Sequence, residues 1–173
     1  PKTTQRFVSR GHDVHLNVYV GTPAELEERV LDNRLHLAIG HFPNHVSGLD
    51  YLPLYQEALG LYCGRRHPLH GSTAENAELL EEISESRIVA RGFMQQHDLD
   101  RLGVSKAAAT VDNIEALAIL IISGAYLGFL PIHFAAQWVN TGEMQQLAPM
   151  SLHLKSPFDV ITRRGVAPSP ILR

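Results

Sequence analysis

The chain has 173 residues, 45% of them hydrophobic, with a formal net charge of -3 and a pI near 6.4. A chain of this length and composition can bury a substantial core, as one domain or as two small lobes. The acidic balance argues against direct contact between this segment and a nucleic-acid backbone. The single cysteine, Cys63, excludes an internal disulfide, which fits a reducing compartment. The most apolar run, residues 116–130, is broken by Ser-Gly and predicts a core helix and strand rather than a membrane span.

The first predicted strands flank a helix with clear start and stop signals. Residues 14–20 alternate apolar and polar side chains, which predicts a strand. Thr22 with Pro23 and Glu25 has the pattern of a capping box with proline at the first helical position. Asn33 suits the left-handed residue that stops a helix, and residues 35–39 then predict a second strand. Together these elements predict a β-α-β unit with a right-handed crossover.

The middle of the chain predicts further strands and a capped helix. Residues 58–63, 88–90 and 107–111 are apolar runs of strand length. Residues 72–80 carry capping side chains before an apolar pattern and predict a short helix. A stretch rich in Gln, His and Asp, with weak helical periodicity, separates the last two of these strands.

The segment VDNIEALAILIISGAYLGFLP, residues 111–131, predicts a strand end, a helix and a buried strand in succession. Asp112 or Asn113 can accept hydrogen bonds from the first free amides of the helix. Gly124 supplies the left-handed residue that ends it. Residues 126–130 then suit a strand buried on both faces, which the following proline closes.

The last predicted elements continue the alternation of helices and strands. A helix from residue 131 to residue 139, a turn, a short segment at 144–147 and a strand at 158–162 complete the pattern. Alternating helices and strands are typical of an α/β fold built on mostly parallel sheets.

Four segments that together cover nearly the whole chain carry recognisable motifs. They are Asp-Asn at residue 112 with Ala-Leu, Ser-Gly and Gly-Phe-Leu-Pro after it, residues 31–40, which are close to the pattern L-x-x-G-x-L-D-L-A-I, residues 54–58, which are close to P-L-x-x-E-x-L, and residues 67–69, which match H-P-L. These motifs resemble those of the effector-binding domain of LysR-type transcriptional regulators. Asn33 stands where the family usually has Gly, and His36 where it usually has Asp.

The resemblance implies a two-lobed, periplasmic-binding-protein-like (type 2) fold, in which each lobe is a mostly parallel sheet with flanking helices. Lobe I would comprise residues 1–62 with 160–173, truncated at both ends, and lobe II residues 63–159. Two crossover strands, residues 58–63 and 158–162, would join the lobes. The family's N-terminal winged helix-turn-helix domain, which would contact DNA, is expected to be absent from this chain.

The resemblance also implies a cytoplasmic bacterial regulator that senses a small effector, expected to be acidic, and alters the geometry of its DNA-bound oligomer. Family members form a homodimer or homotetramer, with lobe I of one copy against lobe II of the next. In this chain the candidate interface helices are residues 23–32 and 131–139. The expected apolar anchors are Leu26, Val30, Ile132 and Trp138.

Ligands of such folds bind outside the carboxyl ends of the strands, where helix N-termini point. This rule nominates a set of residues that follow predicted strands: Gly21, Thr22, His41, Phe42, Gly92, Phe93, Met94, Asp112 and Asn113. The corresponding loops bound the effector cleft in the family. Thr22 and Asn113 could instead be helix caps alone, and the two Phe side chains could pack between lobes.

Other functions have weaker support in the sequence. Among 10 histidines, three pairs have spacings that metal sites tolerate, but no paired Cys accompanies them, so neither metal nor cofactor is expected. No nucleophile, P-loop or dinucleotide motif occurs, which argues against an enzyme. The alternative is a solute-binding protein of a transport system, which shares the two-lobed architecture and would need a signal peptide. The histidine pairs are His12 with His15, His41 with His45, and His67 with His70.

Overall fold

The computed structural model describes residues 5–6, 9 and 15–166. The predictions at His12 and Val14, and those for the ends of lobe I, lie outside the described residues. In chain order the elements are α2 (Pro23–Leu31), β1 (Ala38–Gly40), β2 (Leu49–Gly64), α3 (Ala77–Glu85), β3 (Val89–Arg91), the 3-10 helix η1 (Gly92–Met94), α4 (Gln95–Leu102), β4 (Ala109–Val111), α5 (Ile114–Ile122), β5 (Gly128–Pro131), α6 (Ile132–Asn140), β6 (Met144–Leu147) and β7 (His153–Arg163).

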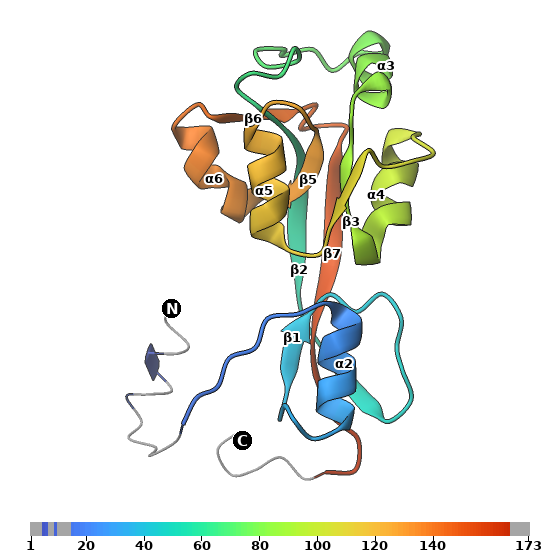
Figure 1. Cartoon of the computed structure of the whole chain (residues 1–173), viewed down its shortest axis with the longest axis vertical. Helices are drawn as coiled ribbons and strands as arrows, with labels where there is room; N and C mark the ends of the chain where they lie inside the picture. Colours follow the sequence, from blue (N-terminus) through green and yellow to red (C-terminus); the bar gives the residue numbers. More distant parts are fainter. Residues whose placement is uncertain (1–4, 7–8, 10–14, 167–173) are drawn as a thin grey trace.

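The molecule has a larger half, which carries helices α3 to α6, and a smaller half, which carries α2 and β1 (Figure 1). Strands β2 and β7 run through both halves and pair antiparallel from Leu49–Arg163 to Gly60–His153. The register shifts between Pro53 and Tyr55. Both strands are longer than predicted because backbone pairing continues through the polar, proline-containing stretch between the halves, where the apolar pattern lapses.

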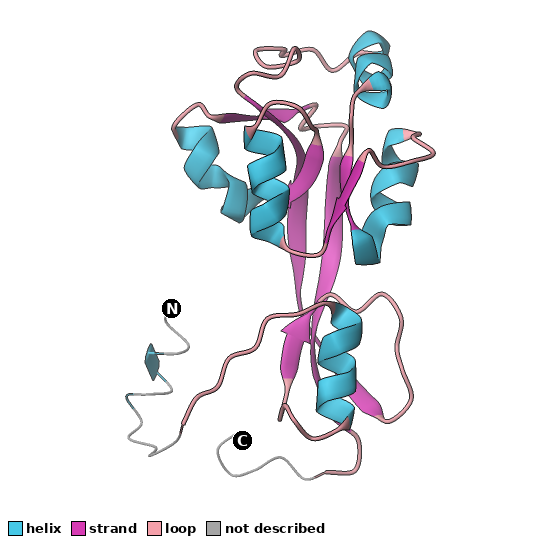
Figure 2. Ribbon diagram, in the orientation of Figure 1, coloured by secondary structure: helices cyan, strands magenta, loops and turns pink. Residues whose placement is uncertain are grey.

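Parallel pairing is less widespread than the alternation of helices and strands predicts. Among the residues that the structure describes, it occurs between β3 and β4 and at a bridge between Ile88 and Leu127. Every pairing of β2 or β7 with another named strand is antiparallel. The cause is the path of the two crossing strands, which enter each half in opposite directions (Figure 2).

The strand predicted at residues 14–20 is wrong for its described part, because residues 15–20 form no regular structure. An extended segment becomes a strand only by pairing, and no strand of the described chain pairs with it. The side chains that should have been buried are exposed, with Val18 74% and Val20 82% accessible. The predicted β-α-β unit therefore begins at its helix.

The predicted helix caps and stops are confirmed, except that one helix begins later in the chain than expected. Thr22 forms the capping box of α2 with Glu25, and Asn33 takes the left-handed conformation at a φ of 60°. Asn113 caps α5, and Gly124 ends that segment at a φ of 78°. The helix predicted at 72–80 begins later, because Asn76 rather than an earlier residue accepts the capping hydrogen bond, from the backbone N–H of Leu79.

Each half has its own apolar core. In the larger half, alternate residues of β2 point to opposite faces, so Leu61 joins the cluster under α3 and α4 while Tyr62 joins the cluster under α5. In the smaller half, Val30, Leu49 and Ile161 are fully buried together. Val30 is therefore wrong as an interface anchor, since its side chain already lies in the core. Within the described residues, no helix has the length and apolar character needed to cross a membrane.

Candidate functional site

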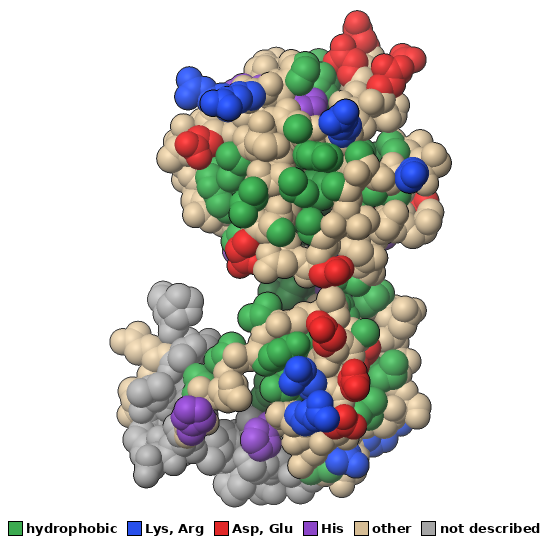
Figure 3. Space-filling view, viewed as in Figure 1, with side chains coloured by type: hydrophobic (Ala, Val, Ile, Leu, Met, Phe, Trp, Pro, Cys, Tyr) green, Lys and Arg blue, Asp and Glu red, His purple; other side chains and the backbone are tan. Residues whose placement is uncertain are grey.

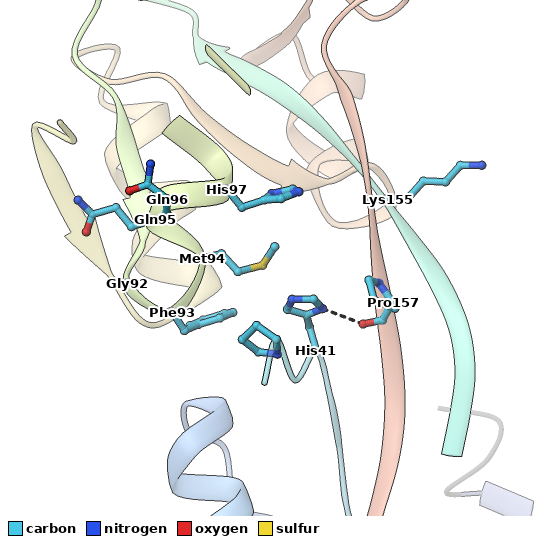
Figure 4. A pocket seen from close by; sticks show the side chains of 10 residues that line it. His41, Gly92, Phe93, Met94, Gln95, Gln96, His97, Lys155 and Pro157 are labelled. Carbon is cyan, nitrogen blue, oxygen red and sulfur yellow. Dashed lines mark hydrogen bonds between the residues drawn. The ribbon is translucent and has the colours of Figure 1, made fainter. Parts of the chain in front are cut away.

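A cavity of about 720 Å³ lies where the two halves meet, beside β7 and below the first turn of α4. Its wall combines the loop after β1, the segment that joins β3 to α4, and one stretch of β7. In Figure 4, His41, Phe93 and Met94 gather beside Pro157. The lining residues are His41, Pro43, Gly92, Phe93, Met94, Gln95, Gln96, His97, Lys155 and Pro157.

His41 connects the smaller half to the crossing strand. Its Nδ1 lies 2.9 Å from the carbonyl oxygen of Pro157. A carbonyl only accepts, so Nδ1 carries the proton and donates. In the neutral ring, Nε2 is then free to accept a hydrogen bond, and in the protonated ring it donates to an anion. The contact fixes the ring where a ligand in the cavity can reach it.

The segment from Gly92 to His97 supplies the opposite wall. It comprises η1 and the start of α4, and neither helix receives a side-chain cap. The N-terminal end of a helix carries partial positive charge, which favours an anion nearby. Arg91, just before this segment, is held by Asp98, with Nη2–Oδ1 at 2.8 Å and Nε–Oδ2 at 3.2 Å. This ion pair is buried and fastens the end of β3 to α4.

The lining is basic in character. It includes Lys155, His41 and His97, and no lining residue is Asp or Glu. Lys155 extends away from the centre of the cavity in Figure 4, so the two imidazole rings and the start of α4 are the nearer groups that can donate hydrogen bonds. Phe93 and Met94 add apolar surface that a carbon skeleton can contact.

The cavity brings together part of the predicted site. His41, Gly92, Phe93 and Met94 line it, as the strand-end rule expects. Phe42 does not: its side chain is 4% exposed and packs in the core of the smaller half, edge-on to Tyr51.

The remaining predicted residues lie at the starts of α2 and α5. Thr22 is engaged in the capping box, where its backbone N–H donates to Glu25 Oε2 at 2.7 Å. Asn113 accepts from the backbone N–H of Ala116 at 2.8 Å. The Asp112 carboxylate lies against the backbone of Gly92, where an added Cβ would collide with it. Gly21, before Thr22, faces Tyr19 and Glu25 in the same way. None of these residues lines the cavity.

Several lining residues were not predicted from the sequence. Gln95, Gln96 and His97 directly follow the predicted Met94 and form the first turn of α4, in the stretch whose helical periodicity is weak. Lys155 and Pro157 precede the residue at which the last strand was expected to begin. The strand was predicted to begin only after Pro157, because proline is rare inside sheets.

Comparisons with known proteins place the chain among transcription regulators. A family model described as LysR substrate binding domain matches residues 1–173. The chain is 34% identical over 164 residues to the HTH-type transcriptional activator BauR of Pseudomonas aeruginosa, which covers 94% of this chain and 53% of BauR. The chain thus spans about half the length of that relative.

Solved structures confirm the predicted α/β, periplasmic-binding-protein-like (type 2) fold. The effector binding domain of QuiR, in complex with shikimate, matches with a TM-score of 0.79 and 14% identity, over 99% of this chain and 83% of that chain. The regulatory domain of CcmR from Synechocystis PCC6803, in complex with 2-PG, matches with a TM-score of 0.78 and 19% identity, over 99% of this chain and 85% of that chain. At these identities the likeness concerns the fold alone.

Proposed function

We propose that this chain, which belongs to the family of LysR substrate-binding domains, binds a small acidic effector in the cavity between its halves and passes that signal to DNA-bound subunits. The observation that carries the proposal is the composition of the cavity wall. It joins both halves, contains His41, His97 and the uncapped start of α4, and includes no carboxylate side chain. A carboxylate placed there meets hydrogen-bond donors from opposite sides.

The similar proteins support a small molecule as the ligand. QuiR was solved with shikimate and CcmR with 2-PG, and both share this fold. BauR is a transcriptional activator with a helix-turn-helix region, which supports DNA binding through a domain that lies outside this chain.

The expected switch is a shift between arrangements of the two halves. A ligand that touches His41 on one side and Phe93 on the other favours whichever arrangement brings both groups against it. A difference in affinity worth about 1–3 kcal/mol changes the balance of arrangements roughly 5- to 150-fold. We expect a shift of this size to alter how subunits assemble on DNA.

The test is a thermal-shift screen of small carboxylates, followed by calorimetry of each hit with matched variants. His41→Ala should weaken carboxylate binding about tenfold or more, because a charge-assisted hydrogen bond is worth roughly 1.5–3 kcal/mol. His153→Ala is the control, since His153 is an exposed histidine of β7 that does not line the cavity.

Phe93→Ala probes the opposite wall independently of any charge. It should lower the affinity for the same ligands, because an apolar contact is lost. Neither His41→Ala nor Phe93→Ala should change the unfolding temperature of the ligand-free protein by much. Equal affinity of the His41, Phe93 and His153 variants would place the ligand elsewhere and reject this cavity as the effector site.

A further inference from the structure

The outer edge of β7 lies open where it borders the cavity. β2 pairs with one side of β7 through this region, whereas β1 pairs with the other side and stops at Gly40–Asp159. No further strand of the described chain pairs with β7. The part of β7 before Asp159 is therefore a strand edge. Two residues of that part, Lys155 and Pro157, line the cavity.

One hydrogen bond fixes the direction of the backbone groups along this edge. The Pro157 carbonyl accepts from His41 Nδ1 at 2.9 Å, so it points away from β2 and toward the cavity (Figure 4). In a strand of an antiparallel pair, the N–H and C=O of one residue point to the same side, and this direction repeats at every second residue. The backbone N–H and C=O of Lys155 therefore also point toward the cavity.

Both backbone groups of Lys155 are available to a ligand. They point away from the ladder with β2, and β1 ends before it reaches them. The Lys155 side chain extends away from the cavity in Figure 4, so this residue presents its backbone there. A strand edge with a free N–H and a free C=O is a template for one more extended segment.

The edge requires a ligand with a donor and an acceptor in the spacing of a peptide residue. In a hydrogen-bonded pair of antiparallel strands, two residues exchange both N–H···O bonds, so the partner must offer an N–H and a C–O group on either side of one carbon. The rest of the lining disfavours a charged amine as the donor, because it includes His41, His97 and Lys155 and no carboxylate side chain. A neutral amide N–H meets both conditions.

The geometry points to an N-acylated amino acid as the effector, held against the backbone of Lys155 as one more residue of the sheet. The amide N–H of the ligand donates to the Lys155 carbonyl, and one carboxylate oxygen accepts from the Lys155 N–H. The other carboxylate oxygen faces the imidazole groups and the start of α4, and the carbon skeleton contacts Phe93 and Met94. The inference rests on the proposed function and narrows it to acids with an amide N–H beside the acidic group.

The first test compares ligands that differ only in the amide N–H. N-acetylglycine, N-acetylalanine and N-acetylphenylalanine are titrated calorimetrically into the purified protein beside the acetyl esters of glycolate, lactate and phenyllactate, in which an oxygen replaces the N–H. In at least one pair the amide should bind about tenfold more tightly than the ester, because the ester loses one hydrogen bond to a carbonyl of the site. The free amino acids should bind more weakly than their N-acetyl forms.

Hydrogen exchange assigns the contact to the Lys155 N–H. The chain has three lysines, at positions 2, 106 and 155, so selective isotope labelling of lysine gives few backbone amide signals in NMR spectra. The signal of Lys155 is the one that Lys155→Ala removes. A saturating N-acetyl amino acid should slow exchange at Lys155 about tenfold or more, because the N–H becomes hydrogen-bonded. Exchange at Lys106, which is exposed and does not line the cavity, is the control.

A pair of variants tests the same N–H by removal. Lys155→Pro and Lys155→Ala both lack the lysine side chain, but only the alanine keeps the N–H. Strand edges accept proline, and this N–H takes no part in the ladder with β2, so both variants should fold, which their unfolding temperatures check. Lys155→Pro should bind N-acetyl amino acids about tenfold or more weakly than Lys155→Ala, as expected for a lost hydrogen bond to a carboxylate.

The outcomes separate this inference from the proposed function. If amides and esters bind equally, or if exchange at Lys155 is unchanged at saturation, the edge contact is wrong while the anion site stands. Tighter binding of a free amino acid than of its N-acetyl form would reject the acylated ligand. If neither these ligands nor any other small carboxylate binds, both the edge contact and the acidic effector are rejected.

Discussion

Tyr51 links polar groups of the smaller half through one hydroxyl. That hydroxyl donates to Glu27 Oε1 at 2.6 Å and accepts from the backbone N–H of Val46 at 2.9 Å. Burial, followed by the bond to Glu27, raises the pKa of Tyr51 to about 12, so the hydroxyl keeps its proton at neutral pH. Glu27 is 8% exposed and depends on this donor.

Tyr51→Phe should therefore lower the free energy of unfolding by about 1–3 kcal/mol, the cost of leaving a buried polar group without its partner. Urea denaturation measures the change. Tyr55→Phe is the control, because Tyr55 is 47% exposed and its ring still stacks on Phe158. Equal stability of the two variants would mean that Glu27 finds another donor.

The raised pKa of Glu57 predicts a pH dependence of stability with a definite sign. Since burial raises the carboxyl's pKa above its ordinary value of 4.5, ionisation costs stability in the folded state. The protonated carboxyl therefore contributes favourably to the free energy of unfolding below pH 4.5, and this contribution is lost as the pH rises through the folded-state pKa.

Glu57→Gln removes that loss, because the amide does not ionise. The free energy of unfolding of Glu57→Gln relative to wild type should increase from acidic to neutral pH, as measured by urea denaturation at each pH. A difference that stays constant with pH would show that the folded and unfolded carboxyls titrate alike.

At the scale of elements, the start of α5 depends on the Asn113 side chain. The amide oxygen accepts from the backbone N–H of Ala116 at 2.8 Å. Asn113→Ala should lower the free energy of unfolding by about 1 kcal/mol, whereas Asn113→Asp should keep it near wild type, because Asp also caps and places negative charge at the positive helix end. Chemical denaturation of both variants checks the contrast, and a loss in both would point to an amide-specific contact.

Local signals in the sequence predicted helices better than strands. Caps and stops such as Thr22, Asn33 and Gly124 act within a few residues, so their roles follow from neighbours in the chain. Strand pairing depends on distant partners instead. Residues 15–20 have a strand pattern but no partner, and residues 49–57 pair with β7 although Pro53 interrupts their pattern.

The cavity could be predicted only in part for the same reason. His41, Gly92, Phe93 and Met94 follow strands, and the rule for α/β folds finds them. Lys155 and Pro157 belong to the middle of a strand, where that rule does not apply. Phe42 alternates with His41 along the chain, and only the packed structure shows which of the two side chains faces the core.

At the scale of the whole molecule, the predicted anchor Ile132 of α6 remains a candidate for contact between copies, together with Val139, which was not predicted from the sequence. Ile132 is 41% and Val139 39% exposed, and hydrophobic side chains gather over α5 and α6 in Figure 3. We expect these residues to pack against α2 of a second copy, where Leu26 is partly buried rather than fully enclosed.

Charged substitutions on α6 test this assembly. Ile132→Arg with Val139→Arg should shift the protein toward monomer in sedimentation experiments at high concentration. Ile119→Arg is the control on neighbouring α5, where Ile119 is 66% exposed and outside the expected interface. A wild-type protein that is monomeric at every concentration would contradict the expected contact.

The connection between the halves also determines which mechanical deformation is easiest. In an antiparallel ribbon the hydrogen bonds run across the strands while the covalent backbone runs along them. Stretching β2 and β7 along their length would therefore strain covalent bonds. Torsion distorts only backbone dihedrals and cross-strand bonds, and two-stranded ribbons adopt a wider range of twist than larger sheets. We therefore expect a ligand that binds on one side of the ribbon to rotate the two halves relative to each other about the long axis rather than to change the distance between them.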